Sequence, residues 1–123
     1  MNDPLAFVIE DDEIIAKIFS TAIQEAKYRA VVIRDGIQAV EKLKETVPDL
    51  VILDLHLPGI SGISILHEIR NDPRLANTRV LIVSADATQS EFLRINADQV
   101  LIKPIGFHAL IEAASKFRPE ESS

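Results

Sequence analysis

The chain has 123 residues, of which 47% are hydrophobic, 26% are charged and none is cysteine; these values are typical of a single globular domain and exclude a disulfide framework or a thiolate metal site. Its formal net charge of −6 argues against the broad basic surface with which proteins bind nucleic acid directly. Its apolar runs are too short to span a bilayer, and its N-terminus lacks the basic start of a signal peptide, so we expect a cytoplasmic protein without membrane insertion.

The chain opens with a predicted strand followed by a predicted helix. Leu5–Ile9 is apolar, and from about Glu13 to Lys27 apolar residues recur at the spacing of one helix face. Asp11 or Asp12 would cap this helix. Its apolar stripe, which we expect to pack against the sheet, consists of Ile14, Ile15, Ile18, Phe19, Ala22, Ile23 and Ala26.

The next two strand–helix pairs repeat this pattern. Val31–Ile33 predicts a strand, and Asp35-Gly36 precedes a helix that Pro48 ends. The apolar positions of this second helix are Ile37, Val40, Leu43 and Val47. Leu50–Leu53 predicts the third strand, and the third helix runs from about Ser61 to Asn71.

Two further pairs complete the pattern. Val80–Val83 and Val100–Ile102 predict strands, and between them lies a short helix from about Thr88 to Ile95. The last helix spans about Gly106 to Lys116. Its inward positions are Phe107, Leu110, Ile111, Ala114 and Phe117.

Most of the predicted strands are apolar at every position, which is typical of parallel strands covered by helices on both faces. Five strand–helix units are too few for a closed barrel, so we expect a three-layer, doubly wound α/β domain. In such open sheets, ligands bind beyond the carboxyl ends of the strands. The functional residues are therefore expected at that edge.

Polar residues end or follow four of the predicted strands: Glu10 and Asp11, then Asp54, Ser84 and Lys103. Taken singly, each has an ordinary explanation. Acids are common at helix N-termini, aspartate often starts a turn, and serine and lysine are frequent in turns and on solvated surfaces. The alternative is a single site, because the carboxyl ends of parallel strands meet at one edge of the sheet.

If the first and third strands are neighbours, Asp11 and Asp54 approach each other with Glu10 close behind. Carboxylates this close raise one another's pKa or require a cation, and Mg²⁺ is the usual oxygen-loving ion. Asp54 could then act as a nucleophile toward a phosphoryl group. Lys103 and the Ser84 hydroxyl would stabilise the equatorial oxygens of that group.

Five motifs occur in order along the chain. They are Val8–Asp12, Asp49–Gly59, Gly62, Val83–Ala85 and Leu101–Pro104. With these motifs the chain resembles, over essentially its whole length, the receiver domain of two-component response regulators. The resemblance implies a flavodoxin-like parallel sheet of order 2-1-3-4-5, with a receiver domain over residues 1–118 and a tail or the start of a linker over residues 119–123.

The resemblance also implies a role for each acid. Asp54 would accept the phosphoryl group, and Asp11 would bind Mg²⁺ or Mn²⁺ directly. Glu10 would act on the ion mostly through water, and Asp54 itself would be a further ligand. The backbone carbonyl of His56 would complete the protein's contribution to the metal.

Two strand ends carry the other implied roles. Ser84 would take the place of the family's hydroxyl residue, which bonds the phosphoryl group, and Lys103 would take the place of its lysine. The peptide bond between Lys103 and Pro104 would be cis, a conformation that proline favours more than any other residue.

The implied partner is a sensor histidine kinase or a phosphotransfer protein whose phosphohistidine donates the phosphoryl group. The domain itself would catalyse the transfer and slowly hydrolyse its own acyl phosphate, with no other enzymatic activity. Phosphorylation would switch binding to a downstream output domain or partner protein. We expect a monomer or a weak dimer.

Two departures from the family concern this switch. Val100 stands where receivers usually carry Tyr or Phe, and its short, stiff side chain cannot swing inward as a ring does. The stretch from Ser84 to Lys103 is also short by about three residues, nearly one helical turn. We therefore expect phosphorylation to act mainly through the loop that begins at Ser84 and Ala85, and less through Val100.

Two other functions compete with this one. A degenerate receiver would serve only as an interaction module, although the full set of acids, Ser84 and Lys103 argues against it. An aspartate-based phosphatase of the haloacid dehalogenase kind would carry its nucleophile at the end of the first strand, with an acid two residues later. Here the candidate ends the third strand, and His56 occupies the place of that acid.

Overall fold

Five parallel strands form a single sheet in the order β2-β1-β3-β4-β5, in a computed structural model that describes residues 3–85 and 91–119. The strands are β1 (Leu5–Ile9), β2 (Arg29–Ile33), β3 (Leu50–Asp54), β4 (Arg79–Ser84) and β5 (Gln99–Ile102). Neighbouring strands pair in parallel throughout, so the predicted flavodoxin-like order is confirmed.

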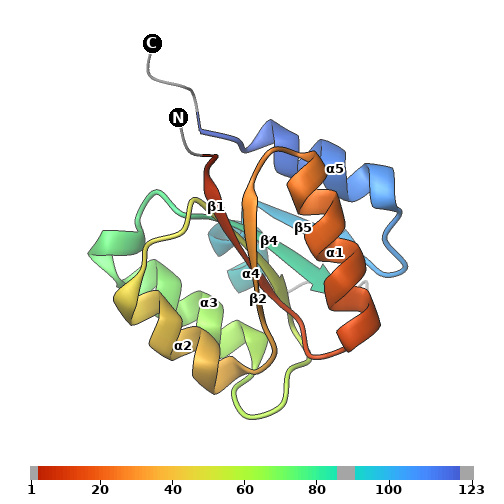
Figure 1. The fold of residues 1–123 in the computed structure, drawn as a ribbon. Helices are drawn as coiled ribbons and strands as arrows, with labels where there is room; N and C mark the ends of the chain where they lie inside the picture. Colours follow the sequence, from red (N-terminus) through yellow and green to blue (C-terminus); the bar gives the residue numbers. More distant parts are fainter. Residues whose placement is uncertain (1–2, 86–90, 120–123) are drawn as a thin grey trace.

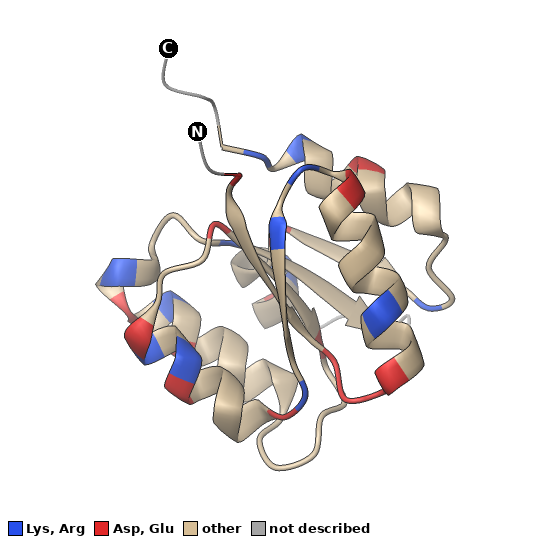
Figure 2. Ribbon diagram, viewed as in Figure 1, with Lys and Arg blue, Asp and Glu red and all other residues tan. Residues whose placement is uncertain are grey.

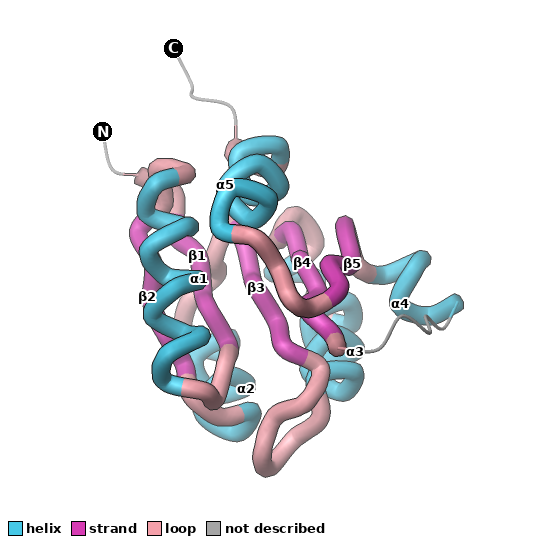
Figure 3. Tube along the Cα trace, turned by 90° about the vertical axis from the view of Figure 1, so that its right-hand side faces the viewer, coloured by secondary structure: helices cyan, strands magenta, loops and turns pink. Residues whose placement is uncertain are grey.

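Helices cover both faces of the sheet. They are α1 (Glu13–Glu25), α2 (Gly36–Glu45), α3 (Gly62–Asn71), α4 (Glu91–Asn96) and α5 (Phe107–Lys116), with a short 3-10 helix at Pro73–Leu75. Figures 1 and 3 show α1 and α5 on one face and α2 and α3 on the other, and Leu93 of α4 packs in the core on the second face. The predicted three-layer α/β architecture is confirmed. Within residues 3–85 and 91–119, no helix has the length and apolar character that crossing a membrane requires.

Side chains of the central strands alternate between two cores. In β1, Ala6 and Val8 belong to the core under α1 and α5, whereas Phe7 and Ile9 belong to the core under α2 and α3. This is the two-residue period of an extended strand. Because helices cover both faces, β1 is apolar at every position, β3 is apolar up to its last residue, Asp54, and both strands are almost completely buried.

Several apolar residues that the sequence pattern predicts to be buried are exposed instead. They are Ile14, Ile18, Val31, Val32, Ile37, Val47 and Phe107, with exposed fractions from 36% to 72%. Val31 and Val32 belong to β2, the edge strand, which the helices cover only in part. On α1, the apolar arc is wider than the surface that the sheet and α5 cover, so Ile14 and Ile18 face solvent. The prediction that these residues of the helix stripes and of β2 are covered is therefore wrong.

The ends of α1 and α2 differ from their predicted places, and the predicted start of α4 is not tested. α1 ends at Glu25, because Lys27 adopts a left-handed backbone with φ of 73°. α2 ends at Glu45, since the backbone is already extended at Thr46, ahead of Pro48. α4 is described from Glu91, and its predicted start at Thr88 lies outside the described residues.

Replacing Lys27 with Gly is expected to stabilise the fold. The left-handed region costs an L-residue roughly 1 kcal/mol, whereas glycine adopts it freely. Lys27 is exposed and follows the helix cap, so its side chain contributes little that would be lost. We expect the free energy of unfolding to rise by about 1 kcal/mol in urea titration. Exposed Lys42, which lies within α2, serves as the control: Lys42→Gly should lower it by a similar amount.

Candidate functional site

The register of the sheet brings the acids of β1 and β3 together. Ile9 pairs with Leu53, so the residue after each, Glu10 and Asp54, emerges at the same level of the sheet. Asp11 follows Glu10 in the loop that leads to α1. The carboxylate oxygens of the three acids offer ligand atoms that all lie within 4.8 Å of one another. The predicted approach of the three acids is therefore found, and Figure 2 shows acidic residues in red in this loop.

The other two predicted residues reach the same edge from β4 and β5. Asp54 pairs with Val83, and the next residue of β4, Ser84, is almost completely buried. Ser84 pairs with Ile102, which places Lys103 directly beyond the end of β5. The Ser84 carbonyl accepts a hydrogen bond from the Lys103 backbone N–H at 2.7 Å. The carboxyl ends of four strands thus meet in one site.

The Asp54 carboxylate is buried and held on both of its oxygens. Its Oδ1 accepts a hydrogen bond from the backbone N–H of His56 at 2.9 Å, and its Oδ2 accepts one from Lys103 Nζ at 3.2 Å. The same Nζ lies 3.5 Å from Glu10 Oε1. The peptide bond between Lys103 and Pro104 is cis, as predicted.

Gly62, one of the motif residues, is required by a close approach of two backbone segments. A Cβ at this position would lie 2.6 Å from the carbonyl oxygen of Asp54 and 2.6 Å from Leu55 Cα. The Gly62 N–H donates a hydrogen bond to the Leu55 carbonyl at 3.1 Å. The first turn of α3 therefore packs directly on the backbone that carries Asp54, and any larger residue would displace it.

The loop from β1 to α1 is fixed by its own side chains and by β2. Glu10 Oε2 accepts a hydrogen bond from the Asp12 N–H at 3.2 Å. Asp12, and not Asp11, caps α1 by accepting from the Ile15 N–H at 2.9 Å. Arg34 donates to the Asp11 carbonyl through Nε and Nη2, at 3.0 and 2.6 Å. The sequence pattern gave no sign of Arg34, because this contact depends on where β2 ends beside the loop.

Burial and charge shift the pKa values of two groups in the site. Burial raises the pKa of Glu10 from its usual 4.5 to about 7, and the negative charge of Asp54 adds to the rise. Burial acts to lower the pKa of Lys103, but the hydrogen bond and charge of Asp54 and the charge of Glu10 outweigh it, so that pKa is raised. Lys103 therefore stays charged, while Glu10 is partly protonated near neutral pH.

The acids fit a hard divalent cation. Among the described residues, none donates a hydrogen bond to Glu10 Oε1, although this oxygen is buried. This oxygen forms an ion pair with Lys103 Nζ at 3.5 Å, but it shares that single positive charge with Asp54, and buried carboxylates are costly unless cations balance them. Three carboxylates of this kind are the oxygen ligands that Mg²⁺ prefers, and Asp11 leaves one side of the cluster open to solvent.

The residues predicted to take part in the switch lie at the β4 and β5 ends of the site. Ala85 is exposed directly after Ser84. Val100 is half-buried in β5, opposite Ile82, and packs against the core under α2 and α3. On the same side of the sheet, Phe92 of α4 stacks on His67 of α3, with ring centroids 5.4 Å apart. The sequence pattern did not predict this aromatic pair.

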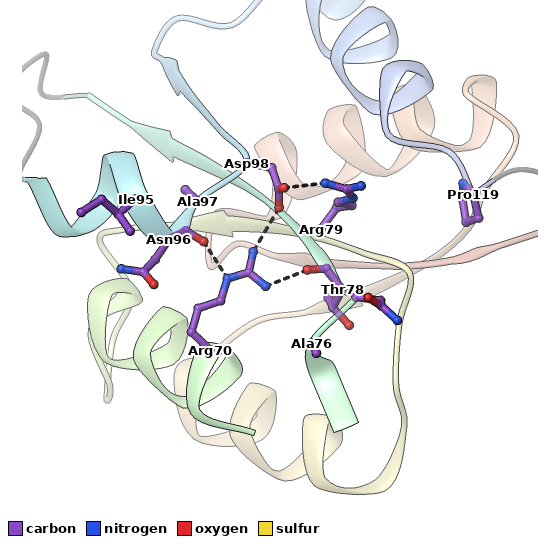
Figure 4. A pocket seen from close by; sticks show the side chains of 10 residues that line it. Arg70, Ala76, Thr78, Arg79, Ile95, Asn96, Ala97, Asp98 and Pro119 are labelled. Atoms are coloured by element: carbon purple, nitrogen blue, oxygen red, sulfur yellow. Dashed lines mark hydrogen bonds and ion pairs between the residues drawn. The ribbon is translucent and has the colours of Figure 1, made fainter. Parts of the chain in front are cut away.

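A separate cavity of about 520 Å³ lies at the opposite edge of the sheet, near the amino ends of β4 and β5 (Figure 4). Arg70 donates hydrogen bonds to the carbonyls of Asn96 and Thr78 and to the Asp98 carboxylate. Asp98 also pairs with Arg79 at 3.0 Å. These charged groups satisfy one another and tie the loop before β5 to α3 and β4, so this cavity is not the candidate site.

A model of the response regulator receiver domain family matches residues 6–115. The chain belongs to this family. The polar-differentiation response regulator DivK of Brucella anthropi is 28% identical to this receiver over 113 residues, which cover 89% of this chain and 92% of that protein.

Solved structures of other receivers have the same fold. The receiver domain of the Francisella response regulator 1452 gives a TM-score of 0.83 at 29% identity and covers 94% of this chain and 96% of its own. The receiver domain of the sensor histidine kinase PA1611 from Pseudomonas aeruginosa PAO1 was solved with a magnesium ion coordinated in its active site cleft. It gives a TM-score of 0.83 at 23% identity, with coverage of 94% and 97%.

Proposed function

We propose that this receiver accepts a phosphoryl group on Asp54 and, once phosphorylated, switches its binding to a partner. One observation carries the proposal: the buried Asp54 carboxylate is fixed by Lys103 and by the His56 N–H, within reach of two further acids. Phosphoryl transfer needs in-line positioning and positive charge on the equatorial oxygens, and little covalent chemistry beyond the nucleophile.

Each residue of the site has a role in this proposal. Asp54 Oδ1 or Oδ2 attacks the phosphorus, and the bond from phosphorus to the donor nitrogen breaks. Lys103 and the Ser84 hydroxyl bind phosphoryl oxygens. Asp11, Asp54 and the His56 carbonyl would hold Mg²⁺ or Mn²⁺ directly, with Glu10 acting through water. When bound, the ion supplies positive charge to the phosphoryl oxygens and neutralises the acids.

Two observations support Mg²⁺ as the cofactor. The three carboxylates form an open cluster in which Glu10 and Asp54 share the single charge of Lys103, and this excess of negative charge suits a hard cation. The PA1611 receiver, which shares this fold, holds magnesium in its active site cleft. Mg²⁺ binding is also expected from membership of the family.

The proposed donor is a phosphohistidine of a sensor histidine kinase or phosphotransfer protein. An apolar cavity of about 490 Å³ on α1 is lined by Ile14, Ile18 and Phe107, among others. A neighbouring cavity of about 380 Å³ also includes Ile18 and reaches Lys103. An apolar helix face of the donor packed on these cavities would bring its phosphohistidine to the edge where Asp54 lies.

We also propose that phosphorylation acts on the loop that begins at Ser84 and Ala85 more than on Val100. Ser84 lies next to the β3 end of the site, whereas Val100 is a short, half-buried side chain that packs against the core. With beryllofluoride as a phosphate mimic, amide chemical shifts of Ser84 and Ala85 should change more than those of Val100 and α5. Equal changes at Val100 would contradict this.

The receiver is proposed to have no enzymatic activity beyond its own phosphorylation and slow hydrolysis of the acyl phosphate. An aspartate-based phosphatase would instead turn over repeatedly with phosphatase substrates. A degenerate receiver that serves only as an interaction module would gain no phosphoryl group at all. A labelling experiment therefore separates the proposed receiver from the degenerate one, and an assay of turnover with phosphatase substrates separates it from the phosphatase.

The labelling experiment measures the mass of the intact protein after incubation with acetyl phosphate and Mg²⁺. The wild type should gain a single phosphoryl group, and the Asp54→Ala variant should gain none. Omission of Mg²⁺ should suppress the gain. A wild type of unchanged mass, or an equal gain in Asp54→Ala, would contradict the proposed function.

A further inference from the structure

Arg34, the residue directly after β2, clamps the backbone of the loop that carries the acids. Its Nε and Nη2 converge on the Asp11 carbonyl at 3.0 and 2.6 Å. The residue before it, Ile33, accepts a hydrogen bond from the Glu10 N–H at 3.0 Å. Two consecutive residues at the end of β2 therefore hold the backbone of two consecutive acids.

The hydrogen bonds of Arg34 go to the backbone of Asp11 and leave its carboxylate available. The guanidinium is planar, and two of its N–H groups reach one carbonyl oxygen. Asp11 is exposed and is followed at once by Asp12, the cap of α1. Among residues 3–85 and 91–119, Arg34 is the one residue that donates a hydrogen bond to the Asp11 carbonyl.

A positive charge at this place would by itself disfavour a metal site. A cation beside acids that bind Mg²⁺ competes with the ion for their negative charge, so its electrostatic effect is to weaken metal binding. The positioning effect of the same residue is opposite in sign, because a loop that is already ordered loses less conformational freedom when the ion binds. Removal of Arg34 therefore separates the two effects: Mg²⁺ affinity rises if the charge dominates and falls if the positioning dominates.

We propose that Arg34 is a positioning residue for the metal site: it fixes the Asp11 peptide so that the Asp11 carboxylate stays within ligand reach of Glu10 and Asp54. This inference rests on the proposed function, since it requires these acids to bind Mg²⁺. Substitution of a residue that orients a metal ligand without touching the ion typically lowers metal affinity by about 10- to 100-fold. Arg34 is exposed and acts on a backbone group, so its effect belongs at the lower end of that range.

The test is calorimetric titration of Mg²⁺ into the wild type and the Arg34→Ala, Arg34→Lys and Arg29→Ala variants. Arg29 is the matched control, because it is an exposed arginine at the other end of the same strand. Arg34→Ala should weaken Mg²⁺ binding by about tenfold. Arg34→Lys retains a single donor nitrogen, so its Mg²⁺ affinity should fall between those of Arg34→Ala and the wild type, and Arg29→Ala should bind Mg²⁺ as the wild type does.

A second measurement does not depend on the metal. In the metal-free protein, Arg34→Ala should speed amide hydrogen exchange at Asp12 by about tenfold, since the loop opens locally, while the thermal midpoint stays near that of Arg29→Ala. If Arg34→Ala binds Mg²⁺ as tightly as the wild type or more tightly, the inference is overturned. The positive charge of Arg34 would then account for its whole effect on Mg²⁺ affinity. Failure of the wild type itself to bind Mg²⁺ would overturn the proposed function, and the inference with it.

Discussion

Replacing Glu10 with Gln is expected to stabilise the metal-free protein at about pH 8 and to weaken Mg²⁺ binding at the same time. Glu10 is almost completely buried, and its pKa is raised from 4.5 to about 7. A carboxyl whose folded pKa is raised binds more protons in the native than in the unfolded state between these values. Stability is therefore lost as the pH rises from about 4.5 to about 7.

Gln has the same shape as protonated Glu and cannot ionise, so it removes this loss. The gain at about pH 8 has a ceiling of about 3 kcal/mol and should vanish near pH 4, where Glu10 is already protonated. Mg²⁺ affinity should fall by at least about tenfold, since a charge beside the ion is removed. Urea titrations at both pH values and calorimetric titration of Mg²⁺ measure the two effects.

Glu41→Gln is the matched control, because Glu41 is exposed on α2. It should leave both stability and Mg²⁺ affinity unchanged. A Glu10→Gln protein that is less stable than the wild type at about pH 8 would show that the ionised Glu10 carboxylate does not destabilise the folded protein.

Replacing Lys103 with Met is expected to slow phosphoryl transfer from acetyl phosphate to Asp54 by about 100-fold. The ammonium group donates to Asp54 Oδ2 at 3.2 Å and lies 3.5 Å from Glu10 Oε1. In the described part of the chain, no other side-chain cation forms an ion pair with these two carboxylates. Met retains most of the apolar length of the side chain but supplies neither charge nor donor.

The rate is measured as the growth of the phosphorylated mass with time at saturating Mg²⁺. Lys42→Met, at an exposed position on α2, provides the comparison and should react as fast as the wild type. The Glu10 pKa should rise further in Lys103→Met, because the lysine charge acts to lower it. Equal rates for Lys103→Met and Lys42→Met would show that Lys103 does not act on the transferred group.

The parallel, doubly covered sheet and the gathering of the site could be predicted because both follow from rules about parallel strands. Strands that are continuously apolar require helices on both faces, and Leu5–Ile9 of β1 and Leu50–Leu53 of β3 show this pattern. Once strands are parallel, residues at or just beyond their carboxyl ends share an edge, as Asp54 and Glu10 do. The particular strand order came from the family resemblance and not from the pattern.

What could not be predicted depends on neighbours that no local pattern specifies. Helical spacing identifies the apolar side of α1 but not how much of it other elements cover, and Ile14 is 72% exposed. The left-handed backbone at Lys27 breaks the usual preference for glycine. Arg34 meets the Asp11 carbonyl only because β2 ends beside the loop from β1 to α1.

The most direct test of Asp54 as the acceptor is chemical mapping of the phosphoryl group. The protein is phosphorylated with acetyl phosphate and Mg²⁺, treated with borohydride, digested and sequenced by tandem mass spectrometry. Borohydride reduces an aspartyl phosphate to homoserine and leaves free carboxylates intact. Homoserine at position 54, and at no other aspartate, is the predicted result; a modified Asp11 or Asp12 with an intact Asp54 would contradict the account.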